Sequence, residues 1–553
     1  MLTQVKRCIS RPISWNLSFH RKYNSMADLF SYTSGRYLFN EAQRLRERHV
    51  EFDLAALLQE AEKIFSPHHG RAASMVKLAE GGFNRVFLLT MQDGFEAIVK
   101  IPYHIAGPKH FATASEAATL QYLLSKGVPV PRVYGYSGRS NPAGVEYLIM
   151  EKAQGVGLQT RWESMSKRER HALATSFVEI EKKFFDIPFA SIGSLYFKTD
   201  VPVELQGALY SQSEEDSETF CIGPTADHSF WDGERAELSL NRGPWNHHDE
   251  FLRSVGEKEI EWTREYGKPV ELDFPHNGFF RGEQNPDDYV ELLHKYLALA
   301  PYLLPRDRGH PLNRPTLRHP DLNANNIFIS ASGAISCIID WQHATVLPRL
   351  LVAGYPRAFE NPDHEEPPNL KEPSPPADYE ALSSEARVEA TELYRRRLLS
   401  HYYRIFNGGL NKPHLAALRD PLLYPRQHLV DRAGRQWRGN LITLKGALVR
   451  MVEYWPHLPE TKGLRCPVQF SDAEREEFAG QEELWFQLNA AVNLWRDEIG
   501  GVSEDGWISN ELYEDACRKV AELKASLIAI DEEDKEDIAL LEKGWPFRDH
   551  EIN

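Results

Sequence analysis

Residues 319–326 read His319-Pro320-Asp321-Leu322-Asn323-Ala324-Asn325-Asn326, and two short apolar runs follow before Asp340-Trp341. The runs are residues 327–329 and 335–339, and the Ser332-Gly333 turn between them predicts a β-hairpin with a polar loop at each mouth. Such a hairpin brings Asp321, Asn326 and Asp340 to one end of a small sheet. This pattern is typical of phosphoryl transfer from ATP, in which the first Asp accepts the acceptor's proton while Asn and the second Asp hold magnesium.

A second interpretation of the same stretch is an Asx-rich turn with no catalytic role, because Asn and Asp cap turns by bonding their own backbone. Carboxylate and amide oxygens are nevertheless the ligands that suit a hard cation such as Mg²⁺. The second Asp at the end of the next apolar run favours the catalytic interpretation. A Gly-rich turn and a lysine-bearing strand upstream, in the order that a phosphotransferase needs, favour it further.

Residues 74–151 are expected to be mostly β-strand. The turn Gly81-Gly82-Phe83-Asn84 separates two apolar runs, and an Asp93-Gly94 turn then leads into strand 97–101, which carries Lys100. An ammonium group flanked by apolar residues is costly unless an anionic group meets it. Phosphates under a Gly-rich flap are the obvious candidate, since small residues let backbone N–H groups approach them. The alternative is a lysine that snorkels from a strand face.

Glu116 allows two interpretations. It fits a capping box with Thr113, and it also lies where a kinase-like fold places the helix glutamate that pairs with the strand lysine, here Lys100. The pairing is favoured. Further along, a last strand, 147–150, leads into Glu151-Lys152-Ala153, the connection to a second lobe, where adenine is expected to bond to backbone groups.

Composition restricts the classes of protein. The chain has 553 residues, too many for one ordinary core, with 42% hydrophobic and 26% charged residues, as in a soluble globular protein. No run of about 18 apolar residues occurs, so no transmembrane segment is predicted. Five scattered cysteines without a Cys-x-x-Cys pair exclude a zinc ribbon and a disulfide framework.

The first 23 residues predict a mitochondrial transit peptide, because they are amphipathic, rich in Arg and Ser, and free of acidic residues. Arg21-Lys22-Tyr23 is the expected processing site; a disordered basic tail is the alternative. The mitochondrial import machinery is therefore an expected partner and the matrix the expected compartment. Cleavage removes five basic side chains and takes the formal net charge from −16 to −21. A mature protein this acidic is not expected to bind nucleic acid.

The order of these motifs resembles the aminoglycoside phosphotransferase and choline kinase branch of the protein-kinase-like fold. It is most similar to the fungal mitochondrial group named for altered inheritance of mitochondria. The resemblance implies an α+β, bilobal fold, with a small antiparallel β-sheet N-lobe carrying one helix and a larger, mainly α-helical C-lobe. It also implies ATP and Mg²⁺ as cofactors and a small-molecule hydroxyl or amine as acceptor. The implied site comprises catalytic Asp321 with His319 supporting its loop, nucleotide-binding Gly81, Gly82, Asn84, Lys100, Glu116, Glu151 and Ala153, and metal-binding Asn326 and Asp340.

One departure from protein kinases is informative. Asp340 is followed by Trp341-Gln342 rather than Phe-Gly, and no Ala-Pro-Glu segment closes an activation loop. This disfavours an atypical protein kinase and favours the small-molecule branch. A third class stays open: a catalytically silent, kinase-like protein that serves as a mitochondrial maintenance or interaction factor.

The remaining segments complete the predicted organisation. A helical extension, with Asp53 as a helix cap, precedes the N-lobe, and the long distance between the two lobes' motifs predicts an insertion around residues 200–260. Trp231 and Trp245 in it are expected to be core or lid residues. The predicted segments are 1–23 transit peptide, 24–73 helical extension, 74–151 N-lobe, 152–360 C-lobe with catalytic loop and insertion, 361–380 Pro-rich acidic loop, and 381–553 C-terminal helical extension.

Overall fold

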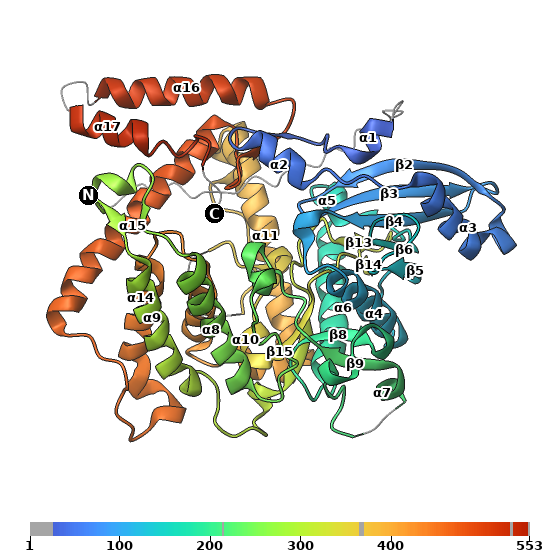
Figure 1. The fold of residues 1–553 in the computed structure, drawn as a ribbon, viewed down its shortest axis with the longest axis horizontal. Helices are drawn as coiled ribbons and strands as arrows, with labels where there is room; N and C mark the ends of the chain where they lie inside the picture. Colours follow the sequence, from blue (N-terminus) through green and yellow to red (C-terminus); the bar gives the residue numbers. More distant parts are fainter. Residues whose placement is uncertain (1–25, 213–214, 364–369, 531–534, 551–553) are drawn as a thin grey trace.

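The structure is a computed structural model that describes residues 26–212, 215–363, 370–530 and 535–550. The predicted transit peptide, 1–23, lies outside the described residues. Figure 1 shows a strand-rich lobe on one side and a larger helical lobe on the other. The predicted bilobal α+β fold is confirmed. In the described part of the chain, no helix combines the length and the apolar character needed to cross a membrane.

The smaller lobe is built on one five-stranded antiparallel sheet. Its strands are β2 (Ala72–Glu80), β3 (Asn84–Met91), β4 (Glu96–Pro102), β5 (Val133–Ser137) and β6 (Tyr147–Glu151). They lie in the order β2-β3-β4-β6-β5, so the lysine strand β4 is central and is paired on both sides. The predicted Asp93-Gly94 turn joins β3 to β4.

Helices cover both faces of this sheet. Because successive side chains of a strand point to opposite faces, Val99 and Ile149 pack toward α3 (Leu54–His69), while Ile98 and Leu148 pack toward α4 (Phe111–Ser125) and the large lobe. Asp53 caps α3 as predicted: its Oδ1 accepts from the Ala56 amide at 2.9 Å. The helical extension therefore closes the outer face of the N-lobe.

The larger lobe contains two cores. In the first, α6 (Lys167–Asp186) and α11 (Ser384–Leu410) pack beside α4. In the second, Trp245 is fully buried, as expected for a core residue. The elements of that second core include α8 (His248–Tyr266), α9 (Pro286–Leu299), α13 (Leu423–Ala433) and α14 (Ile442–Tyr454).

Two small ladders position the predicted catalytic loops. β13 (Ile327–Ile329) and β14 (Ile335–Ile338) form the predicted hairpin, and β12 (Pro315–Arg318) pairs antiparallel with β15 (Thr345–Pro348). Loop 319–326 runs from β12 to β13, and loop 339–344 runs from β14 to β15. Since Arg318 pairs with Thr345 and Ile327 with Ile338, both loops cross the same gap between the ladders. Only the hairpin was predicted.

The two terminal extensions pack against each other. β1 (Arg36–Tyr37) pairs with β16 (Trp507–Ile508), and Phe39 shares a core with Ile499 and Trp545. Three helices complete this unit, of which Figure 1 shows the last two stacked at one edge of the molecule. They are α15 (Asp472–Ile499), α16 (Tyr513–Ile530) and α17 (Lys535–Lys543). The predicted C-terminal helices thus hold the N-terminal extension as well as the second lobe.

Short elements complete the chain. The described parts of the Pro-rich loop, 361–363 and 370–380, contain no strand and no α-helix, and a 3-10 helix, Tyr379–Ala381, begins at the end of the loop. The remaining helices are α1 (Met26–Phe30), α2 (Glu41–Glu47), α5 (Leu158–Arg161), α7 (Asp216–Thr219), α10 (Arg349–Val352) and α12 (Lys412–Leu418). The remaining strands are β7 (Val156–Gly157), β8 (Ser194–Phe197), β9 (Phe220–Gly223), β10 (Val270–Glu271) and β11 (Glu283–Gln284).

Candidate active site

Three charged side chains from distant parts of the chain meet between the lobes. Lys100 Nζ, on β4, donates to both carboxylate oxygens of Glu116, on α4, at 2.8 Å, and to Asp340 Oδ1 at 2.7 Å. Lys100 and Glu116 are buried. The structure therefore contains the predicted Lys100–Glu116 pair. The capping-box alternative is wrong, because α4 already begins at Phe111 and the Thr113 hydroxyl donates to Glu146 Oε2 at 2.7 Å.

The electrostatics of this cluster keep the lysine charged. Burial by itself would lower the pKa of Lys100, but the carboxylates of Asp340 and Glu116 more than offset it and raise that pKa. Burial also raises the pKa of Glu116, against the effect of the ammonium group. For Asp340, the partial enclosure of its carboxylate acts to raise the pKa, yet the adjacent Lys100 ammonium lowers it overall. An ammonium group is thus held ready at the place where phosphates are expected.

The loop that carries Asp340 has an unusual backbone. Asp340 has φ 65°, in the left-handed region that residues other than Gly seldom adopt. Its neighbours fix this conformation: the Ile339 amide donates to the Asn326 carbonyl at 3.0 Å, and the buried indole of Trp341 donates to the Ile338 carbonyl at 3.2 Å. Asp340 keeps 45% of its side chain exposed. The surrounding bonds therefore hold a strained residue with its carboxylate accessible.

His319 connects the two loops through its ring. Nδ1 accepts from the Asp321 amide at 3.1 Å, so the proton is on Nε2, which donates to the Ile339 carbonyl at 2.9 Å. Burial lowers the pKa of His319, consistent with a neutral ring. Both ring nitrogens are thus committed to backbone groups. The ring therefore links loop 319–326 to loop 339–344, and a catalytic part for these loops stays a prediction.

Asp321 and Asn326 lie in the first of these loops. The Asp321 side chain is 56% exposed; its Oδ2 accepts from Asn323 Nδ2 at 2.9 Å, and Arg357 Nη1 lies 3.7 Å from its Oδ1. Asn326 Nδ2 donates to the Asp321 carbonyl at 2.8 Å. That bond orients the amide so that its oxygen, which bonds no described residue, is available to a ligand.

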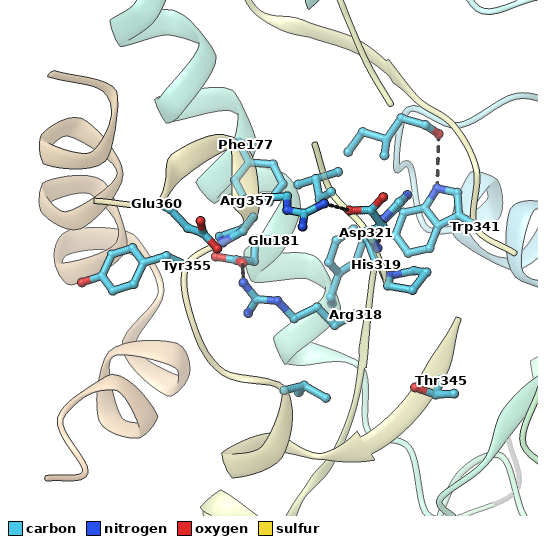
Figure 2. A pocket seen from close by; sticks show the side chains of 16 residues that line it. Phe177, Glu181, Arg318, His319, Asp321, Trp341, Thr345, Tyr355, Arg357 and Glu360 are labelled. Carbon is cyan, nitrogen blue, oxygen red and sulfur yellow. Dashed lines mark hydrogen bonds and ion pairs between the residues drawn. The ribbon is translucent and has the colours of Figure 1, made fainter. Parts of the chain in front are cut away.

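A cavity of about 560 Å³ opens in front of Asp321. Figure 2 shows Arg357 reaching toward Asp321 from one side and Arg318 bound to Glu181 below. Arg318 Nη2 lies 3.0 Å from Glu181 Oε1 and also donates to the Gly354 carbonyl at 2.8 Å, so this cation is engaged within the protein. Sequence reasoning missed Glu181, Arg357 and Glu360 because they come from α6 and from residues 352–360, where no motif marks them.

The Gly-rich turn differs in one respect from the expectation. The Gly81 amide donates to the Asn84 carbonyl at 2.8 Å, and a Cβ added to Gly82 would meet nothing within 4 Å, so this end of the turn is open. Asn84, however, is buried and its Nδ2 donates to Gln342 Oε1 at 2.6 Å. This side chain joins the Gly-rich turn to the Asp340 loop. Its Oδ1 is buried and has no hydrogen-bond partner among the described residues.

The backbone amides of Glu151 and Ala153, in the connection between the lobes, differ in whether they are already hydrogen-bonded. The Glu151 amide donates to the Arg132 carbonyl at 2.8 Å within the sheet, and Glu151 Oε2 accepts from the Arg132 amide at 3.3 Å. The Ala153 amide, by contrast, bonds no described residue. Of the two predicted positions, Ala153 is therefore the one whose N–H is available to an adenine ring.

The donor set suits magnesium. In the described ranges, no group of three or more His, Cys, Asp or Glu side chains could hold a metal ion by itself. Asp340 and Asn326 present one accessible carboxylate and one amide oxygen on loops that bond each other. Magnesium is usually held by one or two such oxygens, with phosphate and water completing the octahedron. The residues present fit that arrangement.

Comparison with known proteins identifies the class. Residues 74–351 match the phosphotransferase enzyme family, and the chain belongs to that family. It is 31% identical over 516 residues to a subtelomeric hrmA-associated cluster protein of Aspergillus fumigatus, covering 87% of this chain and 97% of that one. The predicted family resemblance is confirmed, and the protein is a kinase-like member of the phosphotransferase enzyme family.

Two further matches are more distant. Altered inheritance of mitochondria protein 9, mitochondrial, of Candida albicans is 23% identical over 556 residues, covering 88% of this chain and 84% of that one. Among solved structures, the gentamicin–APH(2")-IIa complex has 14% sequence identity and a TM-score of 0.36, and the match covers 72% of this chain and 97% of that one.

Proposed function

We propose that this protein transfers a phosphoryl group from ATP, with magnesium, to a hydroxyl or amine of a small molecule inside mitochondria. The observation that supports this most strongly is the bonding of Lys100 to both Glu116 and Asp340, at 2.7–2.8 Å. In a phosphotransferase-family chain, that cluster places a charged lysine and an accessible carboxylate beside the loop that carries Asp321.

Each residue has a distinct part in this proposal. Lys100 binds phosphate oxygens, and Glu116 keeps its ammonium group in place. The turn covers the phosphates at Gly82, where it is open, and the Ala153 amide bonds the adenine ring. Asp321 orients the acceptor and accepts its proton at a carboxylate oxygen. His319 takes no proton from the acceptor, since both of its ring nitrogens hold the loop backbone.

Asp340 and Asn326 would hold magnesium. The ion, when bound, supplies neutralisation of the negative charge on the phosphate oxygens. The chain's own contribution is to keep these two oxygens in register: the Ile339 amide bonds the Asn326 carbonyl, so the two loops cannot move independently.

The acceptor is proposed to be a small molecule. A cavity of about 560 Å³ faces Asp321, a volume within the usual range for small-ligand pockets. Its lining combines aromatic walls with the charged side chains of Arg357, Glu360 and Asp321. The sequence has no activation segment to bind a peptide, which supports a small acceptor over a protein substrate.

The mitochondrial location rests on two observations. The relatives named altered inheritance of mitochondria protein 9 carry the designation mitochondrial, and the first 23 residues have the composition of a transit peptide. We propose import to the matrix with cleavage near Tyr23. Sequencing the N-terminus of the protein recovered from mitochondria tests this, and an intact Met1 on a cytosolic protein would contradict it.

The activity is tested in two stages. First, thermal unfolding is followed with ATP, with and without magnesium; a hundredfold ligand excess over Kd should stabilise by roughly 2.7 kcal/mol, and only with magnesium. Second, the protein is incubated with a mitochondrial metabolite extract and ATP, and a mass gain of one phosphate is sought. Binding without transfer would favour the catalytically silent alternative, and no stabilisation under either condition would contradict nucleotide binding.

A further inference from the structure

Three buried charged side chains lie at the base of the Gly-rich turn. Glu80 is the last residue of β2, directly before Gly81, and it faces Arg85 of β3 across the hairpin. Glu80 Oε1 accepts from Lys77 Nζ at 2.8 Å and from Arg85 Nε at 3.0 Å. All three side chains are almost fully shielded from solvent. None of them belongs to the catalytic set described above.

The other oxygen of Glu80 is bound by a segment from outside the lobe. We call residues 29–37 the N-terminal strap. Glu80 Oε2 accepts from the Thr33 amide at 2.8 Å and from the Thr33 hydroxyl at 3.1 Å. Lys77 Nζ also donates to the Ser31 carbonyl at 2.9 Å and to Thr33 Oγ1 at 3.0 Å, and Arg85 Nη1 donates to the Leu29 carbonyl at 2.9 Å. One carboxylate thus joins the strap to the hairpin.

The strap is itself fixed at its far end. Its last two residues, Arg36 and Tyr37, form β1 and pair with β16 of the C-terminal extension. Asn510 Nδ2 adds a bond to the Thr33 carbonyl at 2.9 Å. The Gly-rich turn is therefore connected, through Glu80 and Thr33, to a unit built from both ends of the chain.

A purely structural brace is the competing explanation, and the chain contains a matched example. In the second core, Glu259 bonds Lys258 through one oxygen and Arg235 Nη2 through the other, at 2.6 Å for the arginine. These three side chains are as buried as those around Glu80. The chemistry is the same, but this cluster joins α8 to the 3-10 helix Gly233–Glu237 and contacts neither the Gly-rich turn nor the Asp321 loop.

We infer that Glu80 is a positioning residue for nucleotide, through which the N-terminal strap holds the Gly-rich turn in its phosphate-binding position. This inference rests on the proposed function. A turn that is already fixed loses less conformational freedom when phosphate binds, so the contacts of Glu80 improve ATP affinity without touching ATP. The same contacts leave the phosphoryl transfer step unchanged once ATP is bound.

The experiment compares four variants of the full chain: Glu80→Gln, Thr33→Val, Thr33→Ser and the matched control Glu259→Gln. Unfolding free energy and Kd for magnesium-ATP are measured for each, and KM for ATP and kcat where turnover is detected. We expect Glu80→Gln and Thr33→Val to weaken ATP binding by about tenfold with kcat at saturating ATP retained, as for a preorganisation effect. Thr33→Ser keeps the hydroxyl and should bind like the wild type, and Glu259→Gln should lose stability but not affinity.

Each outcome decides the inference. Unchanged ATP affinity in Thr33→Val, which keeps the strap backbone and the buried charges, would overturn it even if Glu80→Gln failed to fold. An equal loss of affinity in Glu259→Gln would also overturn it, because the effect would then follow stability rather than position. A wild-type chain that binds no magnesium-ATP would instead overturn the proposed function, and the inference with it.

Discussion

Two contacts between charged side chains at the candidate site differ in distance and in solvent exposure. Lys100, Glu116 and Asp340 are joined by bonds of 2.7–2.8 Å, and Lys100 and Glu116 are buried. Arg357 and Asp321 lie 3.7 Å apart, with 71% and 56% of their side chains exposed. The first contact joins side chains of both lobes, two of them buried, whereas the second is exposed to solvent, where a ligand can reach it. In the proposed function, the buried contact serves the nucleotide and the exposed contact faces the acceptor.

The largest expected effect on stability and on ATP binding comes from changing Lys100 in the buried contact. Lys100→Met leaves the Glu116 carboxylate buried without its partner, which should lower the unfolding free energy by about 3–5 kcal/mol and abolish ATP binding. The double variant Lys100→Met/Glu116→Leu removes both charges and should recover much of the stability but none of the binding. Denaturant unfolding and ATP titration measure the two. A Lys100→Met chain that stays fully stable would contradict the buried pairing.

An intermediate effect is expected at His319, which holds the two loops together. His319→Gln should lower the unfolding free energy by about 1–3 kcal/mol, because buried backbone groups lose their partner. Burial lowers the pKa of His319 in the folded state, so below about pH 6.5, the ordinary His value, the unfolded chain binds more protons. Wild-type stability should therefore fall as pH decreases through that value.

Denaturant unfolding at pH 7.5 and at pH 5.5 checks the His319 account. The decrease in stability between the two pH values should be smaller in His319→Gln than in the wild type. Other buried histidines contribute to the wild-type decrease, since burial also lowers the pKa of His343 and of His414. An identical pH dependence in both chains would show that His319 is not held neutral by the loops.

The smallest effect on stability is expected from changing Arg357 in the exposed contact. Arg357→Gln should change the unfolding free energy by less than about 1 kcal/mol, as is usual for exposed ion pairs. ATP affinity should stay at the wild-type value, because Arg357 lines the cavity proposed for the acceptor. Once an acceptor is found, its KM is the quantity that should move. A loss of ATP affinity in this variant would place Arg357 on the nucleotide side instead.

The residues of the buried contact could be predicted from sequence because they lie in short motifs. Lys100 stands in an apolar strand after a Gly-rich turn, and Asp340 ends the run that follows the His-x-Asp-x4-Asn loop. Local pattern and residue chemistry were sufficient for these. The β13–β14 hairpin and the Asp53 cap are also local features, and the structure contains both.

The rest depends on pairings between residues far apart in the chain. Arg36 pairs with Ile508, and Asn84 bonds Gln342; neither contact has a sequence signal, because each depends on how whole elements pack. The cavity proposed for the acceptor could not be predicted either, because Glu181 and Arg357 come from stretches that contain no motif. Sequence motifs therefore indicate the reaction class here, whereas substrate choice depends on tertiary contacts.

The central claim is that Asp321 serves the acceptor while Asp340 serves the nucleotide, and one paired measurement tests it most directly. Magnesium-ATP affinity and turnover are measured for Asp321→Ala and Asp340→Ala. Asp321→Ala should lower turnover by roughly 10²–10⁴-fold and leave ATP affinity unchanged, as expected for loss of a general base. Asp340→Ala should lose both magnesium-dependent ATP binding and turnover. If Asp321→Ala abolished ATP binding while Asp340→Ala retained it, the assignment of the two loops would be wrong.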